Sequence, residues 1–309
     1  MYRKAMVAAA VIAALAGLGC RSKDTGKKVA KVEVKGKNLP SPALVYTSKG
    51  QIYRYRANEK PEFLADGSAW FPALNPAGTL VAYWEDEAAF MSAYVIDIAS
   101  KQKTKIGRWQ TLGANGRNLN LRNSPCWHAT QDLVFFADGR QIWQVSGDGT
   151  NLQTIYEHPD AGCYSLAVSP DGKNIAFVGV TEKDQNLWIY SMVSKQARKV
   201  TDYTVNMGAV GGVSWSPAGD RIAFVLYKTE ESNIVTIPAE GGPTVQLTKS
   251  GNVNSPSWDV TGRKLTVGTG GQNAYIWQVA LMNVADGKLI TQLTDEPHGA
   301  YSPNISGAW

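Results

Sequence analysis

The chain of 309 residues is 44% apolar and 18% charged, an ordinary globular composition that excludes disorder over most of its length. Its 30 Gly, 14 Pro, 13 Tyr and 10 Trp favour strands and tight turns over a helical bundle. Residues 1–41 hold nine Lys and Arg against two Asp and Glu, which leaves 22 basic and 24 acidic residues in 42–309. Because the second part is nearly neutral and no basic cluster follows Lys37, we do not expect nucleic-acid binding.

The N-terminal residues have the pattern of an exported protein. Residues 1–19 combine a short basic start with an apolar stretch shorter than the ~20 residues of a membrane span, which predicts a signal peptide. The stretch leads into Cys20 in a sequence that resembles the lipobox of bacterial lipoproteins, although Gly17 departs from that pattern. Cleavage after Ala16, releasing a soluble protein, is the alternative. The Lys-rich residues 20–41 then predict a lipidated Cys followed by a flexible tether.

One pattern recurs along residues 42–309. Each copy joins a strand residue that is commonly Trp, a Ser-Pro-x-Gly turn and an apolar strand, most clearly at 214–224 and 167–177. The Trp position, which we call the mark of each unit, recurs every 41–53 residues, close to the length of a propeller blade. The marks are Leu74, Trp127, Val168, Trp215, Trp258 and Trp309. This spacing predicts units of four antiparallel strands.

The two ends of the chain complete one unit. Trp309 is the last residue, so its unit lacks every later strand, whereas residues 43–46, 52–55 and 62–64 match the second, third and fourth strands. Joining both ends in one blade closes the ring and leaves no free end strand. We therefore predict an all-β fold over 42–309: a six-bladed β-propeller of four-stranded antiparallel blades, closed by N-terminal strands that join the C-terminal blade.

The repeats resemble the propeller of the TolB family over roughly residues 42–309, through their Trp-Ser-Pro-x-Gly turns and closing Leu-Thr pairs. TolB itself carries an α/β domain before its propeller, and the 20–41 tether leaves no room for one, so the chain resembles a TolB-like propeller lipoprotein. The resemblance implies a non-catalytic protein that binds an envelope protein or peptide, such as a peptidoglycan-associated lipoprotein.

Two faces of such a propeller differ in their connections. The loops that enter the innermost strands and those that join the second and third strands share one face, which we call the loop face, and the Pro-x-Gly turns lie on the opposite turn face. Binding residues are expected where loops vary. Seven Trp fall at repeated strand positions and are explained by packing, whereas Trp70, Trp84 and Trp109 fall outside those positions and near the loop face. The candidate ligand-binding residues of the loop face are Trp70, Trp109, Arg117, Arg122, His158, Asp160, His298 and Tyr301.

Catalytic and metal chemistry are not expected. The chain has no Gly-x-Ser-x-Gly motif, and its Gly pairs precede no helix that would bind phosphate. His158 and His298 precede inner strands on the loop face, but His128 stands in a turn on the opposite face, so we expect loop histidines at the surface without a metal. Cys126 and Cys163 are four residues out of step on neighbouring strands, which argues against a disulfide.

The sequence therefore favours a monomeric, non-catalytic scaffold without cofactors. Arg21 after the lipidated Cys resembles lipoproteins sorted to the outer membrane, which predicts a periplasm-facing protein that contacts the membrane only through its anchor. A soluble periplasmic or a cell-surface location is the alternative. The alternative function is a carbohydrate-binding or polysaccharide lyase-like propeller, in which one channel mouth would gather Arg117, Arg122, His158, His298 and Trp70.

Overall fold

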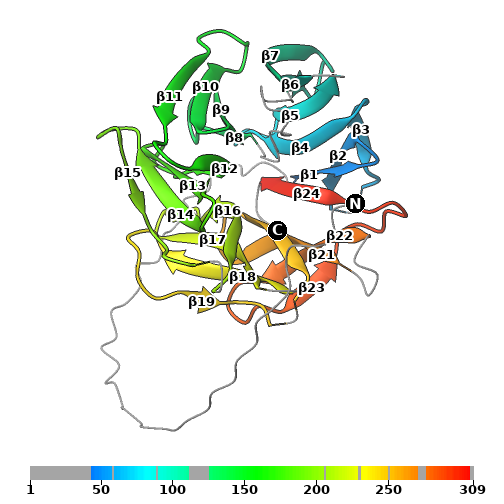
Figure 1. Cartoon of the computed structure of the whole chain (residues 1–309). Coiled ribbons are helices and arrows are strands. Elements are labelled where there is room, and N and C mark those ends of the chain that lie inside the picture. Colours follow the sequence, from blue (N-terminus) through cyan, green and yellow to red (C-terminus); the bar gives the residue numbers. More distant parts are fainter. Residues whose placement is uncertain are drawn as a thin grey trace, which may run out of the picture. The chain divides into compact units, whose positions relative to one another are not determined.

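The structure is a computed structural model that describes residues 43–57, 59–87, 90–110, 125–204, 207–228, 231–249, 251–270 and 276–306. Within these residues the protein has no helix, and its strands form six four-stranded antiparallel sheets, which confirms the predicted six-bladed propeller. Figure 1 shows the sheets as blades around a common centre. The innermost strands are β4 (Ala69–Leu74), β8 (Cys126–Trp127), β12 (Gly162–Val168), β16 (Ala209–Trp215), β20 (Val253–Trp258) and β24 (Tyr301–Ser306).

The other strands continue each blade outward as a meander. The second strands are β1 (Ala43–Ser48), β5 (Leu80–Glu87), β9 (Leu133–Asp138), β13 (Asn174–Val180), β17 (Arg221–Lys228) and β21 (Lys264–Gly270). The third strands are β2 (Gln51–Arg56), β6 (Phe90–Asp97), β10 (Gln141–Ser146), β14 (Gln185–Ser191), β18 (Glu231–Pro238) and β22 (Trp277–Asn283). The outermost strands are β3 (Glu62–Ala65), β7 (Lys103–Gln110), β11 (Gln153–Glu157), β15 (Gln196–Lys199), β19 (Val245–Gln246) and β23 (Leu289–Gln292).

Burial falls from the second strand of each blade to the fourth. Residues 134–137 of β9 and 222–226 of β17 are continuously buried, because both faces of a blade pack against its neighbours. A strand covered on both faces is apolar throughout instead of alternating. By contrast, every residue of β23 is exposed. The core is therefore a series of interfaces between blades.

The turns between first and second strands repeat the same chemistry on the turn face. Ser169 Oγ accepts the backbone N–H of Asn174, five residues later, and the φ of Gly172 is +70°. Because only Gly adopts positive φ at little cost, the turn requires it. The equivalent acceptors in other blades are Asn75, Ser216 and Asp259. This bond explains why a short polar residue precedes the Pro-x-Gly sequence.

The closing blade has the sheet order β24-β1-β2-β3, so it contains both ends of the described chain. Leu44 pairs with Ile305 across the seam between β1 and β24. Tyr46, which is fully buried, donates a hydrogen bond of 2.7 Å from its hydroxyl to Glu296 Oε1, and its burial raises the pKa of that hydroxyl. The N-terminal strands therefore join the last blade as the sequence predicts.

The register of the sixth blade differs from the prediction. The backbone N–H of Leu74 donates to Asn304 Oδ1, as that of Trp258 donates to Ser214 Oγ, so Asn304 occupies the place that Ser214 has in its blade. The sixth mark is therefore Ile305 and not Trp309, which lies outside the described residues. The assignment to Trp309 was wrong because it used Trp to identify the register, whereas this blade has Ile at the mark.

Candidate functional site

Each described inner strand except the two-residue β8 is interrupted at one level by a residue with left-handed backbone. These residues, with φ between 43° and 53°, are Phe71, Ser165, Gly212, Ser255 and Ser302. The pairing of the inner with the second strand shifts register there, as between Trp70 and Ala73. Non-glycine residues in this conformation cost about 1–2 kcal/mol each, and such strain gathers at functional sites. The repeated bulge thus directs attention to the centre of the ring.

The bulges line a central cavity of 460 Å³. Its wall is formed by inner-strand residues of all six blades, and toward the turn face it reaches Asn75 and Val260. Hydroxyl, amide and apolar side chains line it, and among the described residues of its wall there is no Asp, Glu, Lys, Arg or His. This described part of the wall suits a ligand segment that places no charge against it.

Aromatic side chains stand at the loop-side ends of several inner strands, and one of them, Tyr227, lines the cavity. Trp70, Tyr164 and Tyr301 each stand directly before a left-handed residue and four residues before the mark of their blade. In β16 the same position is Gly211, and the ring of Tyr227 from β17 covers it: a Cβ on Gly211 would lie 2.5 Å from Tyr227 Cε2. We call Trp70, Tyr164, Tyr227 and Tyr301 the aromatic collar. Trp70 is 37% and Tyr227 43% exposed, so the collar offers apolar surface to a ligand.

Glycines make room for two of these rings. A Cβ on Gly162 would lie 2.8 Å from Tyr164 Cε2, and a Cβ on Gly299 would lie 2.7 Å from the Tyr301 hydroxyl. Each glycine stands two residues before its tyrosine. The indole of Trp70 is held differently, because its Nε1 donates to Asp86 Oδ2 at 3.2 Å. The orientation of the collar is thus set by loop residues and by one carboxylate.

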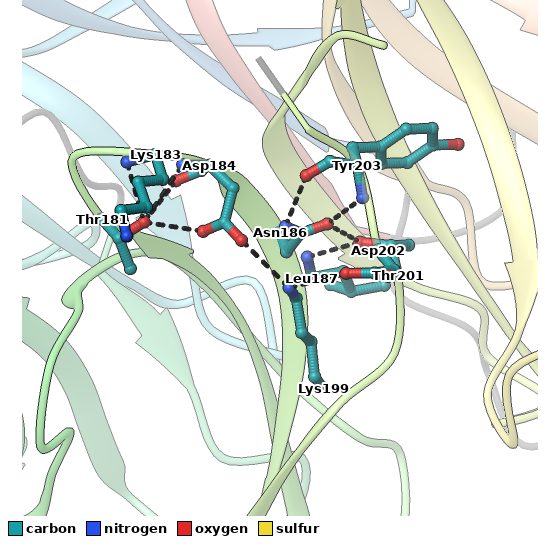
Figure 2. Close-up of polar contacts among 9 residues, drawn as sticks. All are labelled: Thr181, Lys183, Asp184, Asn186, Leu187, Lys199, Thr201, Asp202 and Tyr203. Carbon is teal, nitrogen blue, oxygen red and sulfur yellow. Dashed lines mark hydrogen bonds and ion pairs between the residues drawn. The ribbon is translucent and has the colours of Figure 1, made fainter. Parts of the chain in front are cut away.

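A polar clamp fixes the loops that lead to the collar (Figure 2). Asn186 Oδ1 accepts the hydroxyl of Thr201 at 2.9 Å and the backbone N–H of Tyr203 at 2.7 Å, and Asn186 Nδ2 donates to the Tyr203 carbonyl. Thr201 Oγ1 in turn accepts the backbone N–H of Leu187. Thr201 is the Thr of the closing pair at the end of the blade, and it therefore connects the third strand to the loop that enters β16.

The same clamp occurs in the next two blades. Asn233 accepts the hydroxyl of Thr248, and Gln278 accepts that of Thr294, while each Thr accepts a backbone N–H of the third strand. The two Thr are more than nine-tenths buried. The repeated Leu-Thr sequence is thus explained by a buried hydrogen bond that positions the loop face.

The structure places the predicted site residues in different environments. Trp70 and Tyr301 belong to the collar, and Asp160 and His298 are exposed on the loop face. Trp109 lies in β7, but its side chain is outside the described part, as are Arg117, Arg122 and Cys20. Trp84, expected near the loop surface, is instead fully buried and packs edge-on against Phe136.

His158 corrects the expectation of a surface histidine, because its side chain is only 4% exposed. Its Nδ1 accepts the backbone N–H groups of Asp160 at 3.1 Å and Ala161 at 2.9 Å. Burial lowers the pKa of His158, with Asp160 acting in the opposite direction and Arg140 in the same one. His158 therefore acts as a turn acceptor inside the blade and is not presented to a ligand.

Metal chemistry finds no support among the described residues. No group of three or more His, Cys, Asp or Glu within them could hold a metal ion. Cys126 and Cys163 are both free in this structure, and burial raises the pKa of each thiol. Across the same described ranges, no helix is long and apolar enough to cross a membrane.

Six four-stranded blades around a central cavity define the protein as a six-bladed β-propeller. The TolB beta propeller domain model matches residues 137–307, more than half of the chain, and the chain belongs to that family. The Tol-Pal system protein TolB of Anaeromyxobacter dehalogenans strain 2CP-C is 36% identical over 124 residues, which cover 39% of this chain and 27% of that protein.

A second relative extends the match. An uncharacterized protein of Agrobacterium fabrum strain C58 is 23% identical over 171 residues, 52% of this chain and 55% of that protein. The matches thus span 55% of one relative's length and 27% of the other's.

Solved structures share the fold. TolB from Acinetobacter baumannii superposes with a TM-score of 0.68 and 16% identity over 85% of this chain and 66% of that one. An oligogalacturonate lyase in complex with manganese superposes with a TM-score of 0.53 and 14% identity over 74% and 70%. At these identities the likeness concerns the fold alone.

Proposed function

We propose that the protein is a non-catalytic binding module of the cell envelope, whose loop face holds an extended segment of a protein partner. The observation that carries this proposal is the aromatic collar on the loop face, together with a cavity whose described wall carries no charged side chain. Flat apolar rings with a polar edge give much contact area at a small cost in side-chain entropy, which suits recognition of protein segments. Membership of the TolB propeller family supports the same class of function.

Further apolar side chains on the loop face support a protein partner. Met207, in the loop that enters β16, is 53% exposed, and Ile276, just before β22, is 44% exposed. Like Trp70 and Tyr227, they are exposed apolar side chains on the loop face. Exposed apolar surface that gathers on one face of a folded protein commonly marks an interaction site. We expect the partner to cover this surface while one segment of it enters the channel.

The carbohydrate alternative depended on convergence of basic, His and Trp side chains. His158 is buried and serves the backbone, and Arg117 and Arg122 lie outside the described residues. The collar alone does not favour an acidic sugar, because the described lining of the channel offers no positive charge. A protein segment is therefore the better-supported ligand.

The location of the protein belongs to the same proposal. We propose that residues 1–19 are a signal peptide, that Cys20 is lipidated, and that the propeller faces the periplasm from the outer membrane. In cells, Cys20→Ala should move the protein from the membrane fraction to the soluble fraction. Unchanged membrane association of this variant would contradict the anchor, and it would leave the binding proposal to its own test.

Photo-cross-linking in intact cells tests the binding site. A benzoylphenylalanine replaces either Met207 on the loop face or Val193, which is 72% exposed in the β14–β15 turn on the turn face. We expect a discrete protein adduct from position 207 and none from 193. In the 207 background, Trp70→Ala should reduce the adduct by about tenfold or more, whereas Phe63→Ala on the outer strand β3 should not. Equal adducts from both faces would refute the loop-face site.

A further inference from the structure

The loop that enters β12 is tied to the blade at both of its ends. The backbone N–H of His158 donates to the Arg140 carbonyl at 2.8 Å, and the backbone N–H of Cys163 donates to the Gly139 carbonyl at 2.7 Å. Between these ties, Asp160 and Ala161 are held by the ring of His158, through the two hydrogen bonds to its Nδ1, and Arg140 Nη1 donates to the Pro159 carbonyl. Tyr164 of the aromatic collar follows three residues after Ala161. The position of residues 160–161, which lead to the collar, therefore depends on the His158 ring.

The hydrogen bonds assign the protonation state of that ring. Nδ1 accepts two N–H groups, so it carries no proton and the neutral ring has its hydrogen on Nε2. Nε2 is buried and has no hydrogen-bond partner among the described residues. The ring is enclosed by aromatic side chains, and it lies edge-on to Trp188 with 4.7 Å between ring centroids. The pocket thus accepts the neutral ring, and within the described residues it offers a cation only aromatic rings and no hydrogen-bond acceptor or carboxylate at Nε2.

The groups around the ring do not compensate a positive charge. Asp160, beside it in the loop, is exposed, and Arg140 approaches from the β9–β10 turn with a charge of the same sign as a protonated His158. From the strands the ring meets Tyr156 of β11, while Cys163 of β12 donates its thiol hydrogen to the Arg140 carbonyl. Phe177 and Trp188 complete the pocket without ionisable groups. A proton on Nδ1 would therefore face two N–H donors in an apolar enclosure.

We propose that His158 is a proton-operated latch of the loop face, which holds residues 158–161 and the neighbouring collar when neutral and releases them when protonated. Release is local, because the ring must leave its pocket while β13 and β14 keep their own pairing. The latch is independent of what the propeller binds, so its test does not use the partner. It would make the shape of the channel mouth respond to acid.

His128 provides a matched control within the same chain. Its side chain is 7% exposed, and its Nδ1 accepts the backbone N–H groups of Thr130 and Gln131 in the same geometry. Its Nε2, however, lies 3.2 Å from the Gly172 carbonyl, which accepts the hydrogen of the neutral ring. His128 therefore has a partner for both ring nitrogens, and it lies on the turn face away from the collar.

Hydrogen exchange of the whole chain between pH 4.5 and pH 8 tests the latch, after correction for intrinsic exchange rates. Below a midpoint lower than the ordinary histidine pKa of ~6.5, exchange of residues 158–164 should rise by up to about tenfold per pH unit, because one proton is coupled to one opening. Residues 221–228 of β17 should not change in parallel. His158→Asn, which keeps an acceptor but does not titrate, should abolish the transition, whereas His128→Asn should leave it.

Histidine NMR titration of the unmodified protein keeps the test decisive if a variant does not fold. The imidazole signal of His158 should titrate together with the amide signals of Asp160 and Ala161. Three results would overturn the latch: a transition that persists in His158→Asn, loop amides that do not respond when His158 titrates, and exchange that rises uniformly across the propeller as in global unfolding.

Discussion

Replacing Thr201 by Val should weaken the polar clamp without changing its shape. Thr201 Oγ1 accepts the Leu187 N–H at 2.9 Å and donates to Asn186 Oδ1 at 2.9 Å, and the side chain is 7% exposed. Val fills the same volume but leaves the Leu187 N–H without a partner, and an unsatisfied buried donor costs about 1–3 kcal/mol. Asn186 Oδ1 still accepts the N–H of Tyr203, so losing the Thr201 hydroxyl costs less at Asn186 than at the Leu187 N–H. We expect a loss of about 2–3 kcal/mol in the free energy of unfolding.

Urea denaturation measures this loss against two companion variants. Thr291→Val changes the same residue type on the exposed strand β23 and should alter stability by less than about 0.5 kcal/mol. Thr201→Ser keeps the hydroxyl and should recover most of the stability lost in Thr201→Val. The reasoning is refuted if Thr201→Val and Thr291→Val are equally stable, because the clamp would then contribute nothing beyond the packing of its methyl group.

Three further results are expected. Gly287→Ala should lower the free energy of unfolding by about 3 kcal/mol or more, because its φ is +68° and a Cβ there would lie 1.8 Å from the Leu247 carbonyl oxygen. Gly241→Ala should cost only about 1 kcal/mol, because its φ is +95° but the space around it is open. Urea denaturation measures both. Deleting residues 43–65 removes three strands of the closing blade, and the product should show no cooperative thermal transition; a cooperative one would disprove ring closure. His158 binds protons less readily in the folded chain than in the unfolded one, so stability should fall as pH decreases below ~6.5, and a His158→Asn variant should lose part of this acid sensitivity.

The blade repeat could be predicted because its signals are local. The polar residue before Pro-x-Gly, the glycine at positive φ and the apolar second strand all lie within about eleven residues, as in 214–224. Ring closure followed from the same pattern, since 43–46 match a second strand. The closing register failed at Ile305, where the sequence lacks a Trp. With Ile305 as the mark, Tyr301 falls at the same position as Trp70 and Tyr164, a regularity that the Trp309 assignment concealed.

The candidate site was only partly predictable because it depends on contacts distant in sequence. Tyr227 reaches the channel mouth from a second strand, across a glycine sixteen residues earlier, and no local pattern marks that approach. His158 was expected at the surface because polar loop residues usually are, yet its Nδ1 serves as a backbone acceptor inside the blade. Trp84 was expected near the loop surface, but it is buried because it packs against Phe136 of the next blade, a contact that the local sequence does not show.

The seam between β1 and β24 has a consequence for the order in which the chain matures. β1, β2 and β3 are among the first described strands to be made, but their inner partner, residues 301–306, is made last. A chain synthesised from its N-terminus therefore carries β1 with one unpaired edge until residues 301–306 arrive. Without these residues the blade stays incomplete, so the exposed edge of β1 distinguishes a chain that has closed its ring from one that has not.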